Sequence, residues 1–147
     1  SSSAASDVYK RQGACVLVGG KPVQNTPGYY YLPTVLSNIR SGMPLYSEET
    51  FGPVAALMKV RDEKEAIRRA NDTTYGLGSS IWTRDVEKGK QFIKEIQAGC
   101  VFVNEIVHSD PRLPFGGIKH SGFGRELSWY GMKEFVNIQT IYVKKHW

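Results

Sequence analysis

Cysteines and continuous apolar stretches are both scarce in this sequence, and each scarcity excludes a class of protein. Two cysteines in 147 residues allow at most one disulfide bridge, which argues against a small secreted scaffold held by several bridges. No stretch approaches the roughly 20 apolar residues that a membrane-spanning helix needs, so we expect no membrane partner. The histidines and cysteines lack the spacing of metal ligands, and no metal site is expected. Neither glycine-rich phosphate-binding motif, GxGxxG or GxxxxGK[ST], occurs at a strand-to-helix turn.

The composition is that of a folded domain with a moderate positive charge. Hydrophobic residues make up 41% of the chain, aromatic residues 12% and charged residues 22%, which is enough to build a packed core. The formal net charge of +5 favours anionic partners such as a nucleotide, a carboxylate substrate or nucleic acid. Because the charges are spread along the chain, we expect no nucleic-acid partner and keep a basic nucleic-acid-binding module only as an alternative.

The first twelve residues differ in character from the rest of the chain. They begin with SSSAA and continue as SDVYKRQ, without apolar periodicity. A secretory signal needs a basic start and a continuous apolar centre, and a mitochondrial transit peptide is richer in arginine, so we predict neither and expect a cytoplasmic protein. Residues 1–12 are interpreted as a foreign junction, or alternatively as a natural flexible terminus.

Strand-like and helix-like segments alternate from Gly13 onward. The β-α-β-α-β order over residues 54–104 predicts an α/β fold with a parallel sheet covered on both faces. The segment 39–53 is punctuated by glycine and proline and should be mostly irregular. The predicted strands are 14–18, 29–36, 54–60, 77–83, 100–104 and 138–144, and the predicted helices are 62–71, 85–98 and 126–136.

Both cysteines lie in apolar, strand-like surroundings. Cys15 stands between Ala14 and Val16, and Cys100 opens the run CVFVN. A nucleophilic cysteine needs a partly exposed, electropositive setting and normally a base beside it. We therefore predict that both cysteines are small core residues and that neither is a nucleophile.

The segment 48–53, EETFGP, is unusual for a simple connection. Its adjacent carboxylates repel each other, and the backbone restrictions of Gly52-Pro53 hold the ring of Phe51 in a fixed orientation. A carboxylate with an aromatic ring two residues later can bind a sugar diol and cover a flat ring. The alternative is a charge pair at a helix end beside a core phenylalanine, and the spacing alone leaves both possibilities open.

The segment 113–126, LPFGGIKHSGFGRE, has four glycines in nine positions. Glycine permits positive φ and close backbone approach, while Phe115 and Phe123 can pin the loop. This combination predicts a shaped, rigid loop. Its composition fits ligand binding and a structural tie-down equally well.

Four stretches stand out in order along the chain: GYYYLPT at 28–34, EETFGPV at 48–54, QAGCVFVN at 97–104 and PFGGIKHSGFGRE at 114–126. Together they resemble the C-terminal part of an NAD(P)-dependent aldehyde dehydrogenase, and NDTTYGL at 71–77 fits as well. The resemblance covers about residues 13–147. It implies that residues 13–135 form part of the parallel-sheet catalytic domain and that residues 136–147 form an oligomerisation strand and tail.

The resemblance also assigns roles to individual residues. Glu49 matches the carboxylate that hydrogen-bonds the nicotinamide ribose of NAD or NADP, and Phe51 matches the aromatic residue that packs near the nicotinamide. Phe115 matches an aromatic residue lining the tunnel for the aldehyde. The catalytic cysteine, the glutamate base and the dinucleotide-binding domain lie upstream of Gly13 in relatives, so the resemblance implies no catalytic residue in this chain and no activity of the chain alone.

Ser109-Asp110-Pro111-Arg112 is similar to the corresponding stretch of succinate-semialdehyde dehydrogenases. In that group a serine at the place of Ser109 contacts the substrate carboxylate, and Arg112 could add a bidentate partner to the same carboxylate. In the alternative interpretation, Asp110 and Arg112 merely pair with each other and fix the loop.

The segment 138–144 matches the strand that relatives use in subunit assembly, which implies a homo-oligomer. It also explains an edge strand that would otherwise be bare. A truncated, non-catalytic subunit or assembly module is the alternative function, because it also fits the missing nucleophile.

Overall fold

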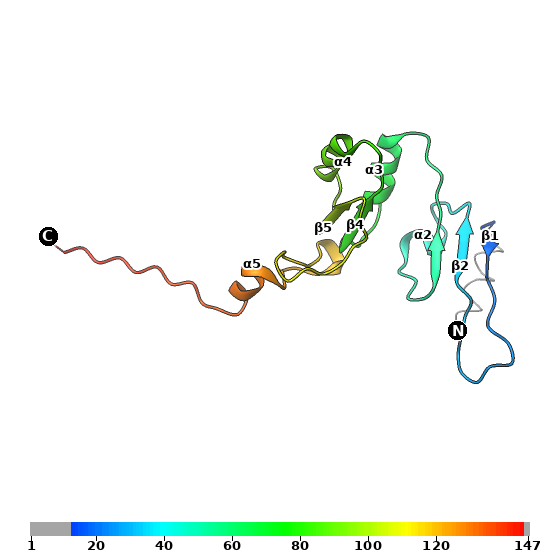
Figure 1. Ribbon diagram of the computed structural model, residues 1–147, viewed down its shortest axis with the longest axis horizontal. Helices are drawn as coiled ribbons and strands as arrows, with labels where there is room; N and C mark the ends of the chain where they lie inside the picture. Colours follow the sequence, from blue (N-terminus) through cyan, green and yellow to red (C-terminus); the bar gives the residue numbers. More distant parts are fainter. Residues whose placement is uncertain (1–12, 146–147) are drawn as a thin grey trace. The chain divides into compact units, whose positions relative to one another are not determined.

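The structure is a computed structural model that describes residues 13–145 (Figure 1), and the chain divides into two units between Glu63 and Lys64. The interpretation of residues 1–12 as a foreign junction concerns a segment outside the described residues. The end of the predicted tail, residues 146–147, also lies outside them. The α/β class is confirmed, because each unit contains a parallel pair of strands.

The first unit contains a three-stranded sheet with the order β1-β2-β3. Strands β1 (Cys15–Val18) and β2 (Thr34–Ser37) pair antiparallel, with an irregularity between Val16 and Val18. Strand β3 (Val54–Ala56) lies parallel to β2, with Thr34 opposite Val54. Leu36 of the central strand is completely buried and is the centre of the core. The other members of this core are Ala14, Ile39, Met43 and Leu45.

A short helix, α2 (Pro44–Ser47), interrupts the segment 39–53 that we predicted to be mostly irregular. Proline fits the first turn of a helix because its missing N–H has no partner there. Leu45 is the buried residue of this turn, and the main-chain N–H of Glu48 donates to the carbonyl of Pro44 at 2.7 Å. The EETFGP segment therefore begins immediately after the helix.

The second unit is built from two strands and the helices around them. Helix α3 (Glu63–Asn71), which begins at the last residue of the first unit, precedes β4 (Gly78–Ile81). Helix α4 (Val86–Ile93) then leads to β5 (Cys100–Val103), which runs parallel to β4. Asp85 begins α4 because its carboxylate accepts from the N–H of Lys88 at 3.0 Å.

The parallel pairing that the order of elements predicted is present in both units, and the strands predicted at 54–60, 77–83 and 100–104 are divided between two sheets. Strand β3 pairs with β2, whereas β4 and β5 form a separate pair among the described residues. The alternation of strand and helix patterns predicts which elements form, but the choice of neighbour depends on which side chains pack together. Here β3 packs Val54 and Ala56 against the core around Leu36.

Several elements are shorter than their sequence patterns predicted. The helix predicted at 85–98 ends at Ile93, because the chain turns and Asn71 accepts from the N–H of Gln97 at 2.8 Å. The helix predicted at 126–136 is α5 (Ser128–Lys133). The strand predicted at 29–36 begins only at Thr34, after an isolated bridge between Pro22 and Tyr31.

The segment 138–144 forms no strand within the described chain, although its sequence predicts one (Figure 1). Its apolar side chains are 75–84% exposed. A β-strand needs a neighbour for its main-chain hydrogen bonds, and no described strand supplies one. Pairing of this segment with a second chain therefore stays a prediction. The exposed residues are Ile138, Ile141, Tyr142 and Val143.

No helix within residues 13–145 is long and apolar enough to cross a membrane.

Candidate functional site

The glycine-rich segment forms a closed hairpin between Phe115 and Glu126. Their main chains exchange two hydrogen bonds, of 2.9 Å and 2.8 Å. A 3₁₀ turn, η1 (Lys119–Ser121), lies between the two arms. The prediction of a shaped loop over residues 113–126 is thus confirmed, and its shape comes from main-chain pairing.

The hairpin is attached to the beginning of strands β4 and β5 through two glycines. The carbonyl of Gly76 accepts from the N–H groups of Gly99 and Ile118, at 3.0 Å and 2.9 Å, and the N–H of Gly76 donates to Ser121 Oγ at 3.0 Å. Gly99 packs so closely on Gly116 that a Cβ at position 99 would lie 1.8 Å from the Gly116 carbonyl oxygen. Only glycine fits at position 99, and this contact fixes the residue that follows Phe115.

The two cysteines differ in their surroundings. Cys100 is buried beneath the hairpin, with its Sγ 3.8 Å from the carbonyl of Gly116, which confirms the prediction of a small core residue. Cys15 is exposed on β1, so the prediction of a core position is wrong for this residue. Its neighbours Ala14 and Val16 face the core because side chains alternate along a strand.

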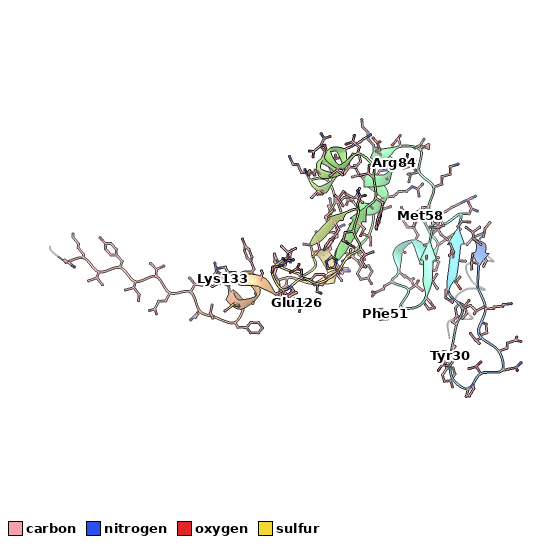
Figure 2. All side chains as sticks on the ribbon, in the orientation of Figure 1. Tyr30, Phe51, Met58, Arg84, Glu126 and Lys133 are labelled. Carbon is pink, nitrogen blue, oxygen red and sulfur yellow. The ribbon has the colours of Figure 1, made fainter. Side chains whose placement is uncertain are left out.

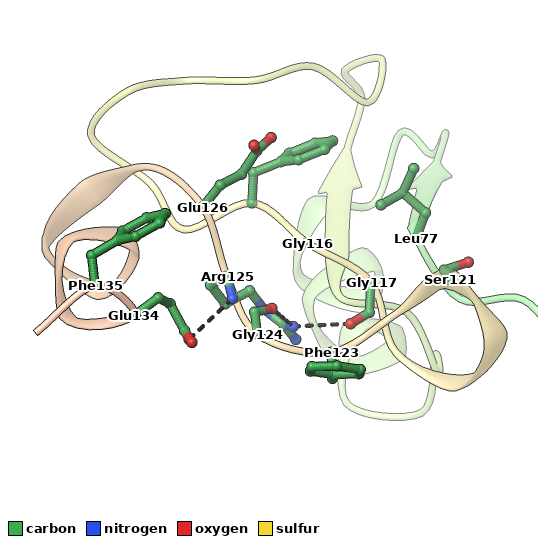
Figure 3. A pocket seen from close by; sticks show the side chains of 11 residues that line it. Leu77, Gly116, Gly117, Ser121, Phe123, Gly124, Arg125, Glu126, Glu134 and Phe135 are labelled. Atoms are coloured by element: carbon green, nitrogen blue, oxygen red, sulfur yellow. Dashed lines mark hydrogen bonds between the residues drawn. The ribbon is translucent and has the colours of Figure 1, made fainter.

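An open hollow of about 410 Å³ lies between the hairpin and the residues Glu134 and Phe135, which follow helix α5. Leu77, Phe115 and Phe135 give it apolar walls, and Arg125, Glu126 and Glu134 line it with charge (Figure 3). Arg125 Nη1 donates to the carbonyls of Gly117 and Gly124, at 2.9 Å and 2.5 Å. The hollow therefore combines an aromatic wall with a guanidinium that ties the two arms together.

Phe123 does not pin the loop as we predicted. Its side chain is fully exposed, whereas Phe115 is half-buried. The loop is held instead by Lys119, Ser121 and Arg125, whose side chains bond to main-chain groups. Sequence reasoning did not single out these three residues. The signal available in the sequence was that all three are polar residues within one short glycine-rich segment.

Asp110 and Arg112 form a two-pronged ion pair upstream of the hairpin. Arg112 Nε and Nη2 donate to the two carboxylate oxygens at 2.9 Å and 2.6 Å, and the Arg112 main-chain N–H adds a bond of 2.9 Å. These hydrogen bonds hold the pKa of the Asp110 carboxyl well below its usual range, and they raise the pKa of the Arg112 guanidinium. The pairing that we kept as the alternative role of Arg112 is therefore present, and the Arg112 side chain is still 86% exposed.

Glu49 and Phe51 lie in the first unit, between α2 and β3. Both side chains are exposed, Phe51 by 96% (Figure 2). The alternative of a core phenylalanine is therefore wrong. The carbonyl of Pro53 accepts from the N–H of Thr34 at 2.8 Å, which anchors the segment at the start of the sheet. Ser109, Arg112 and Phe115 lie in the second unit, where Ser109 is also exposed.

The sequence profile described as "Aldehyde dehydrogenase family" matches residues 4–141. That range covers nearly the whole chain. This chain belongs to the aldehyde dehydrogenase family. The resemblance carried by the EETFGPV and PFGGIKHSGFGRE stretches is thereby confirmed.

Individual aldehyde dehydrogenases match most of this chain but only part of their own length. "Succinate-semialdehyde dehydrogenase [NADP(+)] 1" of Mycobacterium ulcerans is 53% identical over 131 residues, which are 89% of this chain and 28% of that protein. The succinic semialdehyde dehydrogenase of Streptococcus pyogenes, solved with NADP+, is 41% identical with a TM-score of 0.89, over 97% of this chain and 33% of that one. A Mycobacterium tuberculosis aldehyde dehydrogenase solved with NAD+ is 36% identical with a TM-score of 0.85, over 90% and 28%.

This aldehyde dehydrogenase chain thus spans about a quarter of the curated relative with which it shares 53% identity. Within residues 13–145, no cluster of three or more histidine, cysteine or acidic side chains could hold a metal ion. Of the residues predicted to bind a ligand, Glu49, Phe51, Ser109 and Arg112 are exposed, and Phe115 is half-buried on the hairpin.

Proposed function

We propose that this chain is part of a dehydrogenase that oxidises succinate semialdehyde to the dicarboxylic acid with NAD or NADP. The observation that carries the proposal is the closed hairpin from Phe115 to Glu126, which is anchored on Gly76 and Gly99 and presents an aromatic ring beside a hollow. A rigid loop of this kind suits a substrate wall, because the ring is placed before the substrate binds. The names of the Mycobacterium ulcerans and Streptococcus pyogenes relatives support the choice of substrate.

Glu49 and Phe51 are proposed to bind the cofactor. A carboxylate can accept hydrogen bonds from both hydroxyls of a ribose diol, and a phenyl ring can cover one face of a nicotinamide. Both side chains are exposed, so a ligand can reach them without rearrangement of the core. The cofactor supplies hydride acceptance, whereas these two residues bind and orient it.

Ser109 and Arg112 are proposed to bind the carboxylate at the far end of the substrate. Asp110 occupies the Nε and Nη2 side of the Arg112 guanidinium. The Nη1 group is free to donate to a second carboxylate, and the side chain is 86% exposed. An ionised partner makes these hydrogen bonds roughly twice as strong as neutral ones, which would favour an acidic semialdehyde over a neutral aldehyde.

The chain alone is proposed to be inactive. Oxidation of an aldehyde through a thiohemiacetal requires a thiolate that can reach the carbonyl carbon. Cys100 is buried under Gly116, and Cys15 lies on β1 in the first unit, which contains none of the residues proposed to bind the aldehyde. The nucleophile would have to come from a part of the enzyme that this chain does not contain.

A hybrid enzyme tests the proposal directly. The matching segment of the Mycobacterium ulcerans relative is replaced by this chain, and reduction of NADP+ is followed at 340 nm with succinate semialdehyde. We expect turnover with a preference for succinate semialdehyde over butanal, which has the same carbon chain without the carboxylate. A folded hybrid that binds NADP+ and oxidises neither aldehyde would refute the proposed function. Equal use of the two aldehydes would refute the proposed substrate only.

A homo-oligomeric assembly through the segment 138–144 is proposed as part of the same function. The apolar side chains of this segment are exposed in the single chain. This exposure also favours the alternative of a non-catalytic assembly module, and co-purification with an intact dehydrogenase without any gain in turnover would support that alternative.

A further inference from the structure

Lys119 is the one residue of the hairpin turn whose charged side chain crosses to another element. Its Nζ donates to the main-chain oxygens of Asn71 and Thr73, at 3.0 Å each. Asn71 is the last residue of α3. A lysine ammonium at this position satisfies carbonyls that the helix leaves without partners, and it complements the negative end of the helix dipole.

The backbone at Lys119 is held in an unfavourable conformation. Its φ is +55°, in the left-handed region that residues other than glycine, asparagine and aspartate rarely adopt. Such a conformation costs about 1 kcal/mol or more and persists only where surrounding contacts impose it. The contacts on either side are main-chain bonds of 2.9 Å from Ile118 to Gly76 and from His120 to Thr74.

The same contacts restrict the chain on the C-terminal side of Phe115, whose main chain is also paired with Glu126. Between Phe115 and Lys119 the chain contains Ile118, whose N–H is bonded to Gly76, and the pair Gly116-Gly117, which have no side chains to restrict them. Gly116 rests against Gly99, and a Cβ at Gly117 would lie 2.5 Å from Ser121 Cβ. The glycine pair is therefore confined by packing on one side and by the turn that Lys119 holds on the other.

Asn71 extends the connection beyond the hairpin. Its side chain donates to the carbonyl of Glu95 at 2.8 Å and accepts from the N–H of Gln97 at 2.8 Å. Lys119, the end of α3 and the segment that leads into β5 are thus joined at one residue. A displacement of Lys119 would therefore disturb both the end of α3 and the segment that leads into β5.

We propose that Lys119 is a positioning residue, which fixes the turn after Gly116-Gly117 and thereby holds Phe115 at the aldehyde site. The part of this inference that concerns the aldehyde rests on the proposed function. The inference itself rests on the two bonds from Nζ, the imposed φ of Lys119 and the lack of side chains at Gly116 and Gly117.

Hydrogen exchange in the whole 147-residue chain tests the first half. Lys119→Met keeps the length of the stem and removes the donors, and it should speed exchange at the amides of Phe115, Ile118 and His120 by about tenfold. Lys119→Arg can donate to both carbonyls and should restore most of the protection. Lys90→Met is the matched control, because it removes an exposed ion pair with Glu87 on α4 and should change none of these amides. Unchanged exchange in Lys119→Met would overturn the inference.

Kinetics in the hybrid enzyme test the second half. Lys119→Met should raise the KM for succinate semialdehyde about fivefold or more, with the KM for NADP+ within twofold of its original value, and Lys119→Arg should reverse most of the change. Lys119→Met could speed exchange and yet have the same KM for succinate semialdehyde as the unsubstituted hybrid. The turn would then not position Phe115 for the aldehyde, and the inference would be overturned. An unsubstituted hybrid that shows no activity counts against the proposed function and removes the assignment to the aldehyde, while the exchange rates still decide whether Lys119 fixes the turn.

Discussion

Arg112 donates hydrogen bonds to the Asp110 carboxylate from both its guanidinium and its main-chain N–H, and only Pro111 separates the two residues. The three bonds measure 2.6–2.9 Å. Because Pro111 fixes its own φ, the two side chains are held in register by a rigid connection. Exposed ion pairs contribute little to stability in general, so the value of this pair lies in the direction that it gives to the guanidinium.

The first prediction concerns the acid titration of Asp110. Its pKa lies below the ordinary value of about 3.9 because Arg112 donates to the ionised form. A lowered carboxyl pKa stabilises the folded chain above the unfolded pKa, and the contribution is lost as the pH falls from about 4 through the folded value. Carbon-13 NMR of the Asp110 carboxyl should show the ionised form persisting below pH 3.

Substitution of the arginine should reverse this shift. Arg112→Gln removes the charged donor, so the Asp110 midpoint should move up toward the ordinary range. Arg84→Gln removes one equal charge elsewhere in the second unit and should leave the midpoint where it is. A midpoint near 3.9 in the unsubstituted chain would show that the ion pair does not form in solution.

The second prediction separates the two roles of Arg112. In the hybrid enzyme, Arg112→Ala should raise the KM for succinate semialdehyde by about tenfold or more, since a charged hydrogen bond of roughly 1.5–3 kcal/mol is lost, and should change the KM for butanal by less than twofold. Equal losses for the two aldehydes would assign Arg112 to loop structure alone. Arg84→Ala is the control for the change in net charge.

Much of the local structure could be predicted from the sequence. Helix α3 and strands β1 and β5 lie within one residue of the predicted boundaries, because a capping aspartate or a terminating glycine marks them. The position of β3 in the sheet could not be predicted. A short apolar run such as Val54–Ala56 fits beside either neighbour, and the choice follows from packing against Leu36, which no periodicity encodes.

The candidate site divides in the same way. Phe115 and the glycines around it were evident as a shaped loop, since their residue types restrict the backbone. The contacts that give the loop its place are long-range: Lys119 reaches Asn71 across 48 positions and Ser121 reaches Gly76 across 45. A single sequence contains the donors and acceptors but does not state which of them meet, so these supports were missed.

The third prediction tests the contact between Gly99 and Gly116. Gly99→Ala would place a methyl group 1.8 Å from a carbonyl oxygen, so the hairpin or β5 must move. We expect a loss of about 3 kcal/mol or more in the free energy of unfolding of the second unit, measured by urea denaturation with the fluorescence of Trp82 and Trp129. Gly52→Ala adds a methyl group where nothing lies within 4 Å and should change stability by less than about 0.5 kcal/mol. A Gly99→Ala chain as stable as Gly52→Ala would contradict the close packing.

The fourth prediction is that the isolated chain does not oxidise aldehydes. With succinate semialdehyde and either NAD or NADP, absorbance at 340 nm should not rise above the buffer rate, because Cys100 is buried and Cys15 belongs to the unit that contains none of the residues proposed to bind the aldehyde. Cys15→Ser and Cys100→Ser are the controls that would trace any residual turnover to a thiol. Turnover that Cys15→Ser abolishes would show that the exposed cysteine acts as a nucleophile.

The last prediction concerns association through the segment 138–144. Ile141 is 79% exposed on a segment of alternating strand-like residues, and an exposed apolar segment of this kind can pair with another chain. Ile141→Lys places a charge on that edge, and light scattering should show association weakened at least about tenfold. Ile106→Lys is a matched control, because it also replaces an exposed isoleucine, 63% accessible, with lysine in the second unit. Equal weakening by both substitutions would mean that general apolar exposure drives association, whereas weakening confined to Ile141→Lys would assign the interface to the tail.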